Sequence, residues 1–233
     1  MNYLLEVCLT IALATGIMPS LVAQSNPDAV PMMRKGISVQ MPVTRTAMAM
    51  PDADKEDATV VIITEDGGVY LGLNPTDADA VAGSVRDVLS SQPGKNVYVK
   101  ADARAPYSQV HRVLAVLRAA GVEAPSLLTS QPHTTESGTL LPPEGLGVLV
   151  GPRRAPSSPA IVQLSPQRSV LKVNGEPVPR ASLQNRLAQF FRNRSDEIVQ
   201  IEADGSLPFA VVVDVIDGCR AAGAKVVLAT PTL

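Results

Sequence analysis

A long internal repeat is the feature that most constrains the fold of this 233-residue chain. Residues 97–121 align with residues 199–223 at an offset of 102 positions, and chance would give only about one or two identities in such a window. Ten positions are identical: Val97, Ala101, Asp102, Pro106, Val110, Val113, Arg118, Ala119, Ala120 and Gly121 all recur 102 positions later. The repeat predicts one small unit built twice, and the chain length allows this.

Both copies contain the same local signals. Each begins with an alternating, β-branched run, "NVYVKAD" or "EIVQIEAD", which predicts a strand. A proline follows, and then an apolar stripe at i, i+3, i+4 and i+7, which predicts a helix packed on a sheet. The stripe residues are Val110, Val113, Leu114 and Leu117 in the first copy, and Val212, Val215, Ile216 and Cys219 in the second.

The tetrapeptide "RAAG" ends both predicted helices. Gly121 and Gly223 stand where a helix commonly closes with a left-handed residue, which glycine adopts without steric cost. Arg118 and Arg220 place a cation in the last turn, where it interacts favourably with the helix dipole. Short strand patterns, "PSLLT" and "KVVLAT", come next, so the motif predicts a helix that turns back quickly into its sheet.

The repeat extends upstream with weaker similarity. "TVVIITEDGGVYLG" predicts two strands around an Asp66-Gly67-Gly68 turn, and "IVQLSPQRSVLKVNG" predicts the same around 166–169. A helix pattern follows each hairpin, with Val81, Val85 and Leu89 in the first copy and Leu187 with Leu183 and Phe190 or Phe191 in the second. We therefore expect an α/β (α+β) fold of two tandem β-β-α-β-α-β units. Each unit is expected to be an open sheet with two helices on one face, after an N-terminal apolar helix.

Composition shifts divide the chain into five segments. The predicted segments are a signal anchor or signal peptide (1–24), an irregular arm (25–57), a first unit (58–130), a Pro/Gly-rich linker (131–159) and a second unit (160–233). Within the linker, the apolar stretch "LGVLV" is a candidate for an added strand.

The N-terminus bears on localisation. Residues 7–23 carry no charge and reach roughly 25 Å as a helix, slightly short of a bilayer core. A cleaved signal peptide and an uncleaved anchor both fit this length, and no Lys or Arg before Arg34 orients the segment. Either interpretation places the remainder outside the cytoplasm.

Several functional classes are disfavoured by composition. The 20 basic and 22 acidic residues form no long basic block, which argues against a nucleic-acid partner. The two cysteines and two histidines do not have metal-ligand spacing, and neither unit combines a nucleophile with a base. We expect a non-enzymatic protein without metal or other cofactor.

The motifs of the first unit resemble the ExbD/TolR family, the small subunits of bacterial motors that use the proton-motive force for outer-membrane work. The resemblance runs from "GISVQMP" through "TEDGGVYLG" and "VYVKADARAPYSQVHRVLAVLRAAG" to "LLT", and residues 160–231 look like another copy. It implies one N-terminal helix in the bacterial inner membrane, a dimerising periplasmic domain, and no enzyme activity. It also implies an ExbB/TolQ-like channel partner, with a TonB/TolA-like transducer or peptidoglycan bound outside.

The chain departs from the family pattern in two ways. It carries two copies of the periplasmic unit, and the membrane aspartate that handles protons is absent. Glu6, at the start of the apolar segment, is the nearest candidate for a proton relay, and cleavage of that segment would remove it. At the two equivalent strand-to-helix turns, Asp102, Tyr107, Asp204 and Phe209 are candidates for partner binding, although the two carboxylates also suit capping of free N–H groups.

Two functional hypotheses follow from these observations. The first is an anchored motor subunit whose two units pair with each other across a pseudo-two-fold axis, or which forms a homo-oligomer. The second is a cleaved, soluble periplasmic binding module without a motor role. In either case covalent linkage keeps the second unit at a millimolar effective concentration, on the order of that given by a short flexible linker.

Overall fold

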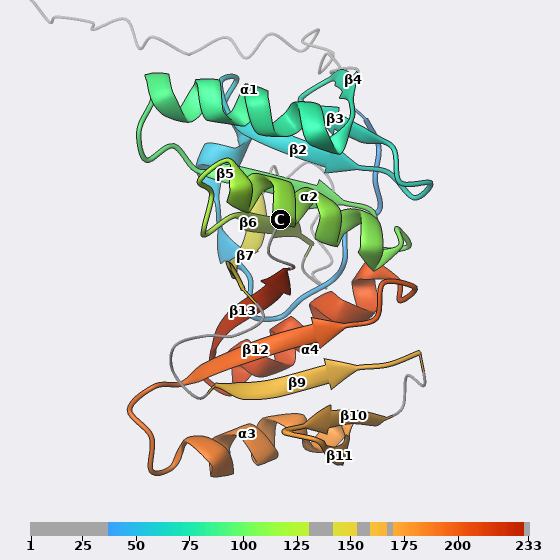
Figure 1. The fold of residues 1–233 in the computed structure, drawn as a ribbon, viewed down its shortest axis with the longest axis vertical. Helices are drawn as coiled ribbons and strands as arrows, with labels where there is room; N and C mark the ends of the chain where they lie inside the picture. Colours follow the sequence, from blue (N-terminus) through green and yellow to red (C-terminus); the bar gives the residue numbers. More distant parts are fainter. Residues whose placement is uncertain (1–36, 131–141, 153–158, 167–169, 231–233) are drawn as a thin grey trace, which may run out of the picture. The chain divides into compact units, whose positions relative to one another are not determined.

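Two β-sheets and four α-helices make up the described part of the chain (Figure 1). The computed structural model describes residues 37–130, 142–152, 159–166 and 170–230, and all of them belong to one compact unit, 36–233. Glu6 and the predicted apolar helix lie outside these residues. Among the helices that the structure does describe, none is both long and apolar enough to cross a membrane.

The first sheet is built mainly from the N-terminal half, which we define as residues 59–129. The elements of this half are β2 (Thr59–Ile63), β3 (Val69–Leu71), β4 (Asn74–Thr76), α1 (Ala78–Ser91), β5 (Val97–Ala101), α2 (Tyr107–Ala119) and β6 (Ser126–Thr129). Two further strands, β1 (Met48–Ala49) and β7 (Glu144–Gly147), extend this sheet, and the strand order is β1-β7-β6-β5-β2-β3-β4.

The second sheet is built mainly from the C-terminal half, residues 160–230. Its elements are β9 (Ala160–Leu164), β10 (Val170–Val173), β11 (Glu176–Pro179), the 3-10 turn η2 (Arg180–Ser182), α3 (Leu183–Phe191), β12 (Ile198–Ala203), α4 (Phe209–Ala221) and β13 (Lys225–Thr230). With β8 (Leu149–Pro152) the order is β11-β10-β9-β12-β13-β8. The five strands from β6 to β4 and the five from β13 to β11 therefore have the same order.

The strand registers of the two halves are alike apart from a shift of one residue. The Val69–Thr76 pair of the first hairpin maps onto Leu171–Val178 of the second at the offset of 102 positions. The central parallel pairs differ by one residue, because Thr59 pairs with Val97 whereas Ala160 pairs with Val199. The first half thus has one residue fewer between β2 and β3 than the second half has between β9 and β10. After these loops, equivalent residues are 102 positions apart as far as Gly121 and Gly223.

The predicted helix faces are confirmed. All eight stripe residues of α2 and α4 are at most 1% exposed. Gly121 and Gly223 have φ values of +96° and +85°, so both helices close with the left-handed residue that the "RAAG" motif predicts. In α3 it is Phe191 that faces the core, while Phe190 stays partly exposed.

Each half has one strand more than the sequence pattern predicts, so the order is β-β-β-α-β-α-β. The extra strands, β4 and β11, fold back on the preceding strands through tight turns. Those turns contain left-handed residues, Gly72 at φ +60° and the pair Asn174 and Gly175 at +53° and +87°. Three-residue and four-residue strands are too short for a periodic signal, which explains why the pattern analysis missed them.

The expected strand in "LGVLV" is present as two strands, β7 and β8, that serve different sheets. β7 runs antiparallel to β6, whereas β8 runs parallel to β13. Only Val148 separates them, so one extended segment completes both sheets. Gly145 is required for this arrangement, because an added Cβ would lie 2.5 Å from the carbonyl oxygen of Leu127.

Candidate partner-binding site

The two strand-to-helix turns that the sequence analysis singled out meet each other. The N–H of Tyr107 donates to the carbonyl oxygen of Leu207 at 2.8 Å, and the N–H of Phe209 donates to that of Ala105 at 2.9 Å. Pro106 and Pro208 form an antiparallel bridge between them. We call this contact, made by residues 103–108 and 205–210, the junction.

A second pair of hydrogen bonds gives the junction its two-fold character. The N–H of Ser108 donates to the carbonyl oxygen of Gly205, and that of Ala210 to the carbonyl oxygen of Ala103, both at 2.9 Å. The offset of 102 positions converts each of these bonds into the other, as it does for the bonds of Tyr107 and Phe209. The four backbone bonds of the junction therefore form two pairs whose members are exchanged by the offset.

The junction also satisfies the starts of α2 and α4. The first N–H groups of a helix have no partner within it, and both helices begin after a proline that provides no side-chain cap. Carbonyl oxygens of the opposite half take that role for the first two N–H groups of each helix. Each half thus completes a helix terminus of the other.

Tyr107 and Phe209 are buried at the junction, at 1% and 0% exposure. The ring of Tyr107 lies 5.5 Å from that of His111, whose Nε2 is 2.8 Å from the carbonyl oxygen of Ala229 in the opposite half. The hydroxyl of Tyr107 has no hydrogen-bond partner within the described residues, and burial raises the pKa of Tyr107 well above its usual value. Both side chains contribute apolar contact area.

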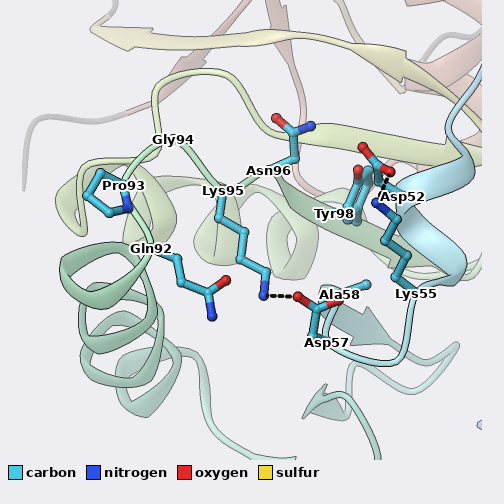
Figure 2. A pocket seen from close by; sticks show the side chains of 10 residues that line it. All are labelled: Asp52, Lys55, Asp57, Ala58, Gln92, Pro93, Gly94, Lys95, Asn96 and Tyr98. Atoms are coloured by element: carbon cyan, nitrogen blue, oxygen red, sulfur yellow. Dashed lines mark hydrogen bonds and ion pairs between the residues drawn. The ribbon is translucent and has the colours of Figure 1, made fainter.

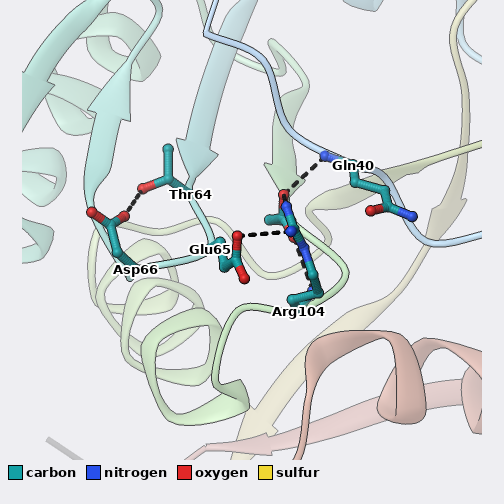
Figure 3. A network of polar contacts seen from close by, with 6 residues as sticks. Gln40, Thr64, Glu65, Asp66 and Arg104 are labelled. Atoms are coloured by element: carbon teal, nitrogen blue, oxygen red, sulfur yellow. Dashed lines mark hydrogen bonds and ion pairs between the residues drawn. The ribbon is translucent and has the colours of Figure 1, made fainter.

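Asp102 is buried at the end of β5 and is the centre of a polar network. Figure 3 shows Gln40, Glu65 and Arg104 of this network. Its Oδ1 accepts from the N–H and Nε of Arg104, and its Oδ2 accepts from Nη2 of Arg104 and from the N–H of Gln40. Arg104 also pairs with Glu65 at 2.8 Å. The hydrogen bonds from the Arg104 side chain are the main cause that lowers the pKa of Asp102 to about 2, so the carboxylate is charged at neutral pH.

Asp204, the equivalent residue, is in a simpler environment. It is exposed, and its Oδ1 accepts from the N–H and the hydroxyl of Ser206, which lower the pKa of Asp204. Each aspartate accepts a hydrogen bond from the backbone N–H two residues later in the chain, but only Asp102 also binds an arginine side chain. The carboxylates bind a loop N–H and not an N–H group of α2 or α4, so the prediction that they cap the helix starts is wrong.

The arm that precedes the first sheet binds both halves. The carbonyl oxygen of Gln40 accepts from the N–H of Ala103, and the N–H of Thr44 donates to the carbonyl oxygen of Ser130. Beyond that point the arm reaches α4, where the carboxylate of Asp217 accepts from the N–H groups of Arg45 and Thr46 and from the hydroxyl of Thr46. The arm was expected to be irregular. Its described part has no regular secondary structure apart from β1 and the 3-10 turn η1 (Pro51–Asp54), but hydrogen bonds hold it to both halves.

A surface hollow of about 350 Å³ lies where η1 approaches the loop after α1 (Figure 2). Lys55 pairs with Asp52 at 2.7 Å and Lys95 with Asp57 at 3.0 Å, so its charged side chains neutralise one another. The lining also includes Asn96 and the buried Tyr98. No group of acidic, histidine or cysteine side chains in the described part of the chain is arranged to hold a metal ion.

The structure brings the four candidate residues into one region and divides them by exposure. Tyr107 and Phe209 are inaccessible, Asp102 is occupied by Arg104 and Gln40, and Asp204 is exposed. Sequence reasoning missed Asp217, because its role depends on an arm far away in the sequence. Its one signal is that Asp217 replaces Ala115 within an otherwise similar helix.

Comparison with known families identifies the class of protein. The sequence matches the family described as biopolymer transport protein ExbD/TolR over residues 29–132 and 134–232. A search of curated proteins gives no match. The chain belongs to the ExbD/TolR family, whose members are non-enzymatic components of energy-coupled biopolymer transport.

Proposed function

We propose that the chain is the small subunit of a proton-motive-force-driven envelope transport system, and that it carries two copies of the family domain paired within one polypeptide. The observation that supports this most directly is the junction, in which the first two N–H groups of α2 and α4 are satisfied by the opposite half. The two segments of the family match and the equal strand orders support the same proposal.

In this proposal the N-terminal segment anchors the chain in the inner membrane beside an ExbB/TolQ-like channel subunit, and Glu6 supplies the proton site. The paired domains lie in the periplasm and bind a TonB/TolA-like transducer or peptidoglycan. Asp204 is the accessible member of the four candidate residues, so it is the partner contact that we expect. The buried Tyr107 and Phe209 hold the pair together.

The outer edges of the sheets bear on how a partner binds. β4 and β11 are each the terminal strand at one end of their sheet, and they carry Pro75 in β4 and Pro177 and Pro179 in β11. Proline has no N–H to offer to an added strand, so these edges are poor sites for β-addition. We therefore expect the partner at the turn of Asp204 rather than at the outer edges.

The first experiment is the intact mass of the chain expressed with its native N-terminus, together with its membrane fractionation. Full-length mass in an alkali-resistant membrane fraction, with co-purification of a channel subunit, supports the proposal, and Glu6→Gln then tests proton coupling. A soluble protein whose mass corresponds to a chain that begins near residue 24 contradicts the motor role and favours a soluble binding module.

A further inference from the structure

In the described part of the chain, four strands form the ends of the two sheets, and three of these ends are closed to a further strand. β4 and β11 carry prolines, which have no N–H to donate to a neighbour. At β8, the N–H of Val150 donates to the carbonyl oxygen of Glu123 at 2.8 Å. The N–H of Val148, just before this strand, donates to the carbonyl oxygen of Pro125, so residues 123–125 cover that edge.

The fourth end, formed by β1, is open. β1 pairs with β7 on one side only, and the N–H of Met50 donates to the carbonyl oxygen of Pro143 in line with this pairing. Backbone groups alternate in direction along a strand, so the N–H and the carbonyl group of Ala49 point away from β7. Neither group has a partner among the described residues, and Ala49 is exposed. An unpaired edge of this kind is a template for pairing with another chain.

The flanks of β1 carry opposite charges. Arg45 lies four residues before Ala49 and is exposed, and only its backbone N–H is used, by Asp217. Asp54 lies five residues after Ala49 and is also exposed. Neither side chain forms an ion pair with a residue that the structure describes, whereas the nearby Asp52 is paired with Lys55. An edge with one basic and one acidic flank is complementary to an antiparallel copy of itself.

We infer that the edge of β1 pairs with the same edge of a second copy of this chain, antiparallel and about a two-fold axis at Ala49. Each Ala49 then donates to and accepts from the other, and Arg45 of each copy lies beside Asp54 of the other. Met48, which is 55% exposed, adds apolar contact area next to these bonds.

The length of β1 limits what this contact can form. A strand of two residues has room for one reciprocal pair of backbone bonds, which suits a weak dimer rather than a growing aggregate. The pairing also uses the same edge on both copies, so it closes after two chains. It joins chains whose own halves are already paired at the junction, and it does not rest on the membrane anchor or on the proposed transport role.

Cross-linking through a single introduced cysteine tests the contact. The full-length chain in mild detergent carries Cys8→Ser, so that its remaining native cysteine is the buried Cys219. A short bismaleimide should join two chains that carry Ala49→Cys. Leu73→Cys is the matched control, because Leu73 is 62% exposed in the turn between β3 and β4, at the opposite end of the first sheet, and should not cross-link.

Two charge variants, each combined with Ala49→Cys, test the antiparallel geometry. Arg45→Glu brings acidic flanks together and Asp54→Arg brings basic flanks together. Each contact occurs twice in the dimer, so we expect either variant alone to dimerise about tenfold more weakly. A mixture of the two variants should restore cross-linking, because every flank then faces one of opposite charge.

Each outcome decides the inference. A cross-link at position 49 that is lost in each charge variant and returns in their mixture supports it. Equal cross-linking at position 73 overturns it, because the chains then meet by random collision, and a mixture that stays monomeric overturns it, because the flanks then do not meet. It is also overturned if Ala49→Cys gives no dimer while its thiol reacts with a monofunctional maleimide, since the edge is then accessible but unpaired.

Discussion

Tyr107 and Phe209 donate their backbone N–H groups to carbonyl oxygens of opposite halves, at 2.8 and 2.9 Å, and are equivalent residues at the offset of 102 positions. Their side chains differ by one hydroxyl, which is buried without a partner in Tyr107. The second half thus already contains the apolar version of the same contact. The backbone bond and the buried aromatic ring are therefore common to both halves, whereas the hydroxyl is present only in the first half.

Exchanging the two aromatic residues tests that difference. We expect Tyr107→Phe to leave the free energy of unfolding unchanged or to raise it by up to about 1 kcal/mol, because it removes an unpaired buried hydroxyl. Phe209→Tyr should lower it by roughly 1–3 kcal/mol by introducing one. Urea unfolding of both variants provides the measurement, and a loss of stability in Tyr107→Phe would mean that the hydroxyl has a partner.

The Asp102 network predicts a specific dependence on pH. Its pKa of about 2 in the folded chain is below the ordinary 3.8, so its stabilisation is complete above about pH 4 and is lost as the pH falls toward 2. We expect Asp102→Asn to cost roughly 1–2 kcal/mol at pH 7, since the half-exposed Arg104 is partly screened by solvent. The difference in the free energy of unfolding between the variant and the wild type, measured by urea unfolding, should disappear near pH 2. A difference that persists at that pH would assign the loss to packing.

The bond between the arm and α4 is tested at Asp217. Asp217→Ala removes the acceptor of the Arg45 and Thr46 N–H groups, and we expect their hydrogen exchange to accelerate about tenfold or more. Asp214→Ala is the matched control, because Asp214 lies on the same helix but pairs with Arg180. Equal acceleration in both variants would show a general loosening of α4.

Two glycines of β7 form a second matched pair. We expect Gly145→Ala to lower the free energy of unfolding by about 1–3 kcal/mol, because the added Cβ would collide with the Leu127 carbonyl oxygen. Gly147→Ala has no heavy atom within 4 Å of its Cβ and should change stability by less than about 0.5 kcal/mol. Thermal or urea unfolding of the two variants measures both effects, and similar losses would show that backbone flexibility rather than contact is responsible.

Local signals of the sequence accounted for most of the elements within each half. Apolar spacing located α2 and α4, the closing glycines located their ends, and alternation located β5 and β12, because these patterns record how each element faces its own core. Strands of two to four residues, such as β4 and β1, leave too few positions for a pattern. For Phe190 and Phe191 the sequence left the alternative open, since adjacent helix positions differ only in how the helix is rotated on the sheet.

What the sequence by itself determined is the repeated unit, its helix faces and the family, since each depends on residues close in the chain. Only the tertiary structure decided that the two turns cap each other's helices, that one segment completes both sheets, and that Asp217 bonds to the arm. These contacts join backbone groups or side chains far apart in sequence, and a backbone N–H or carbonyl group is the same in every residue but proline. Their partners are therefore set by the packing of the two sheets rather than by any local pattern.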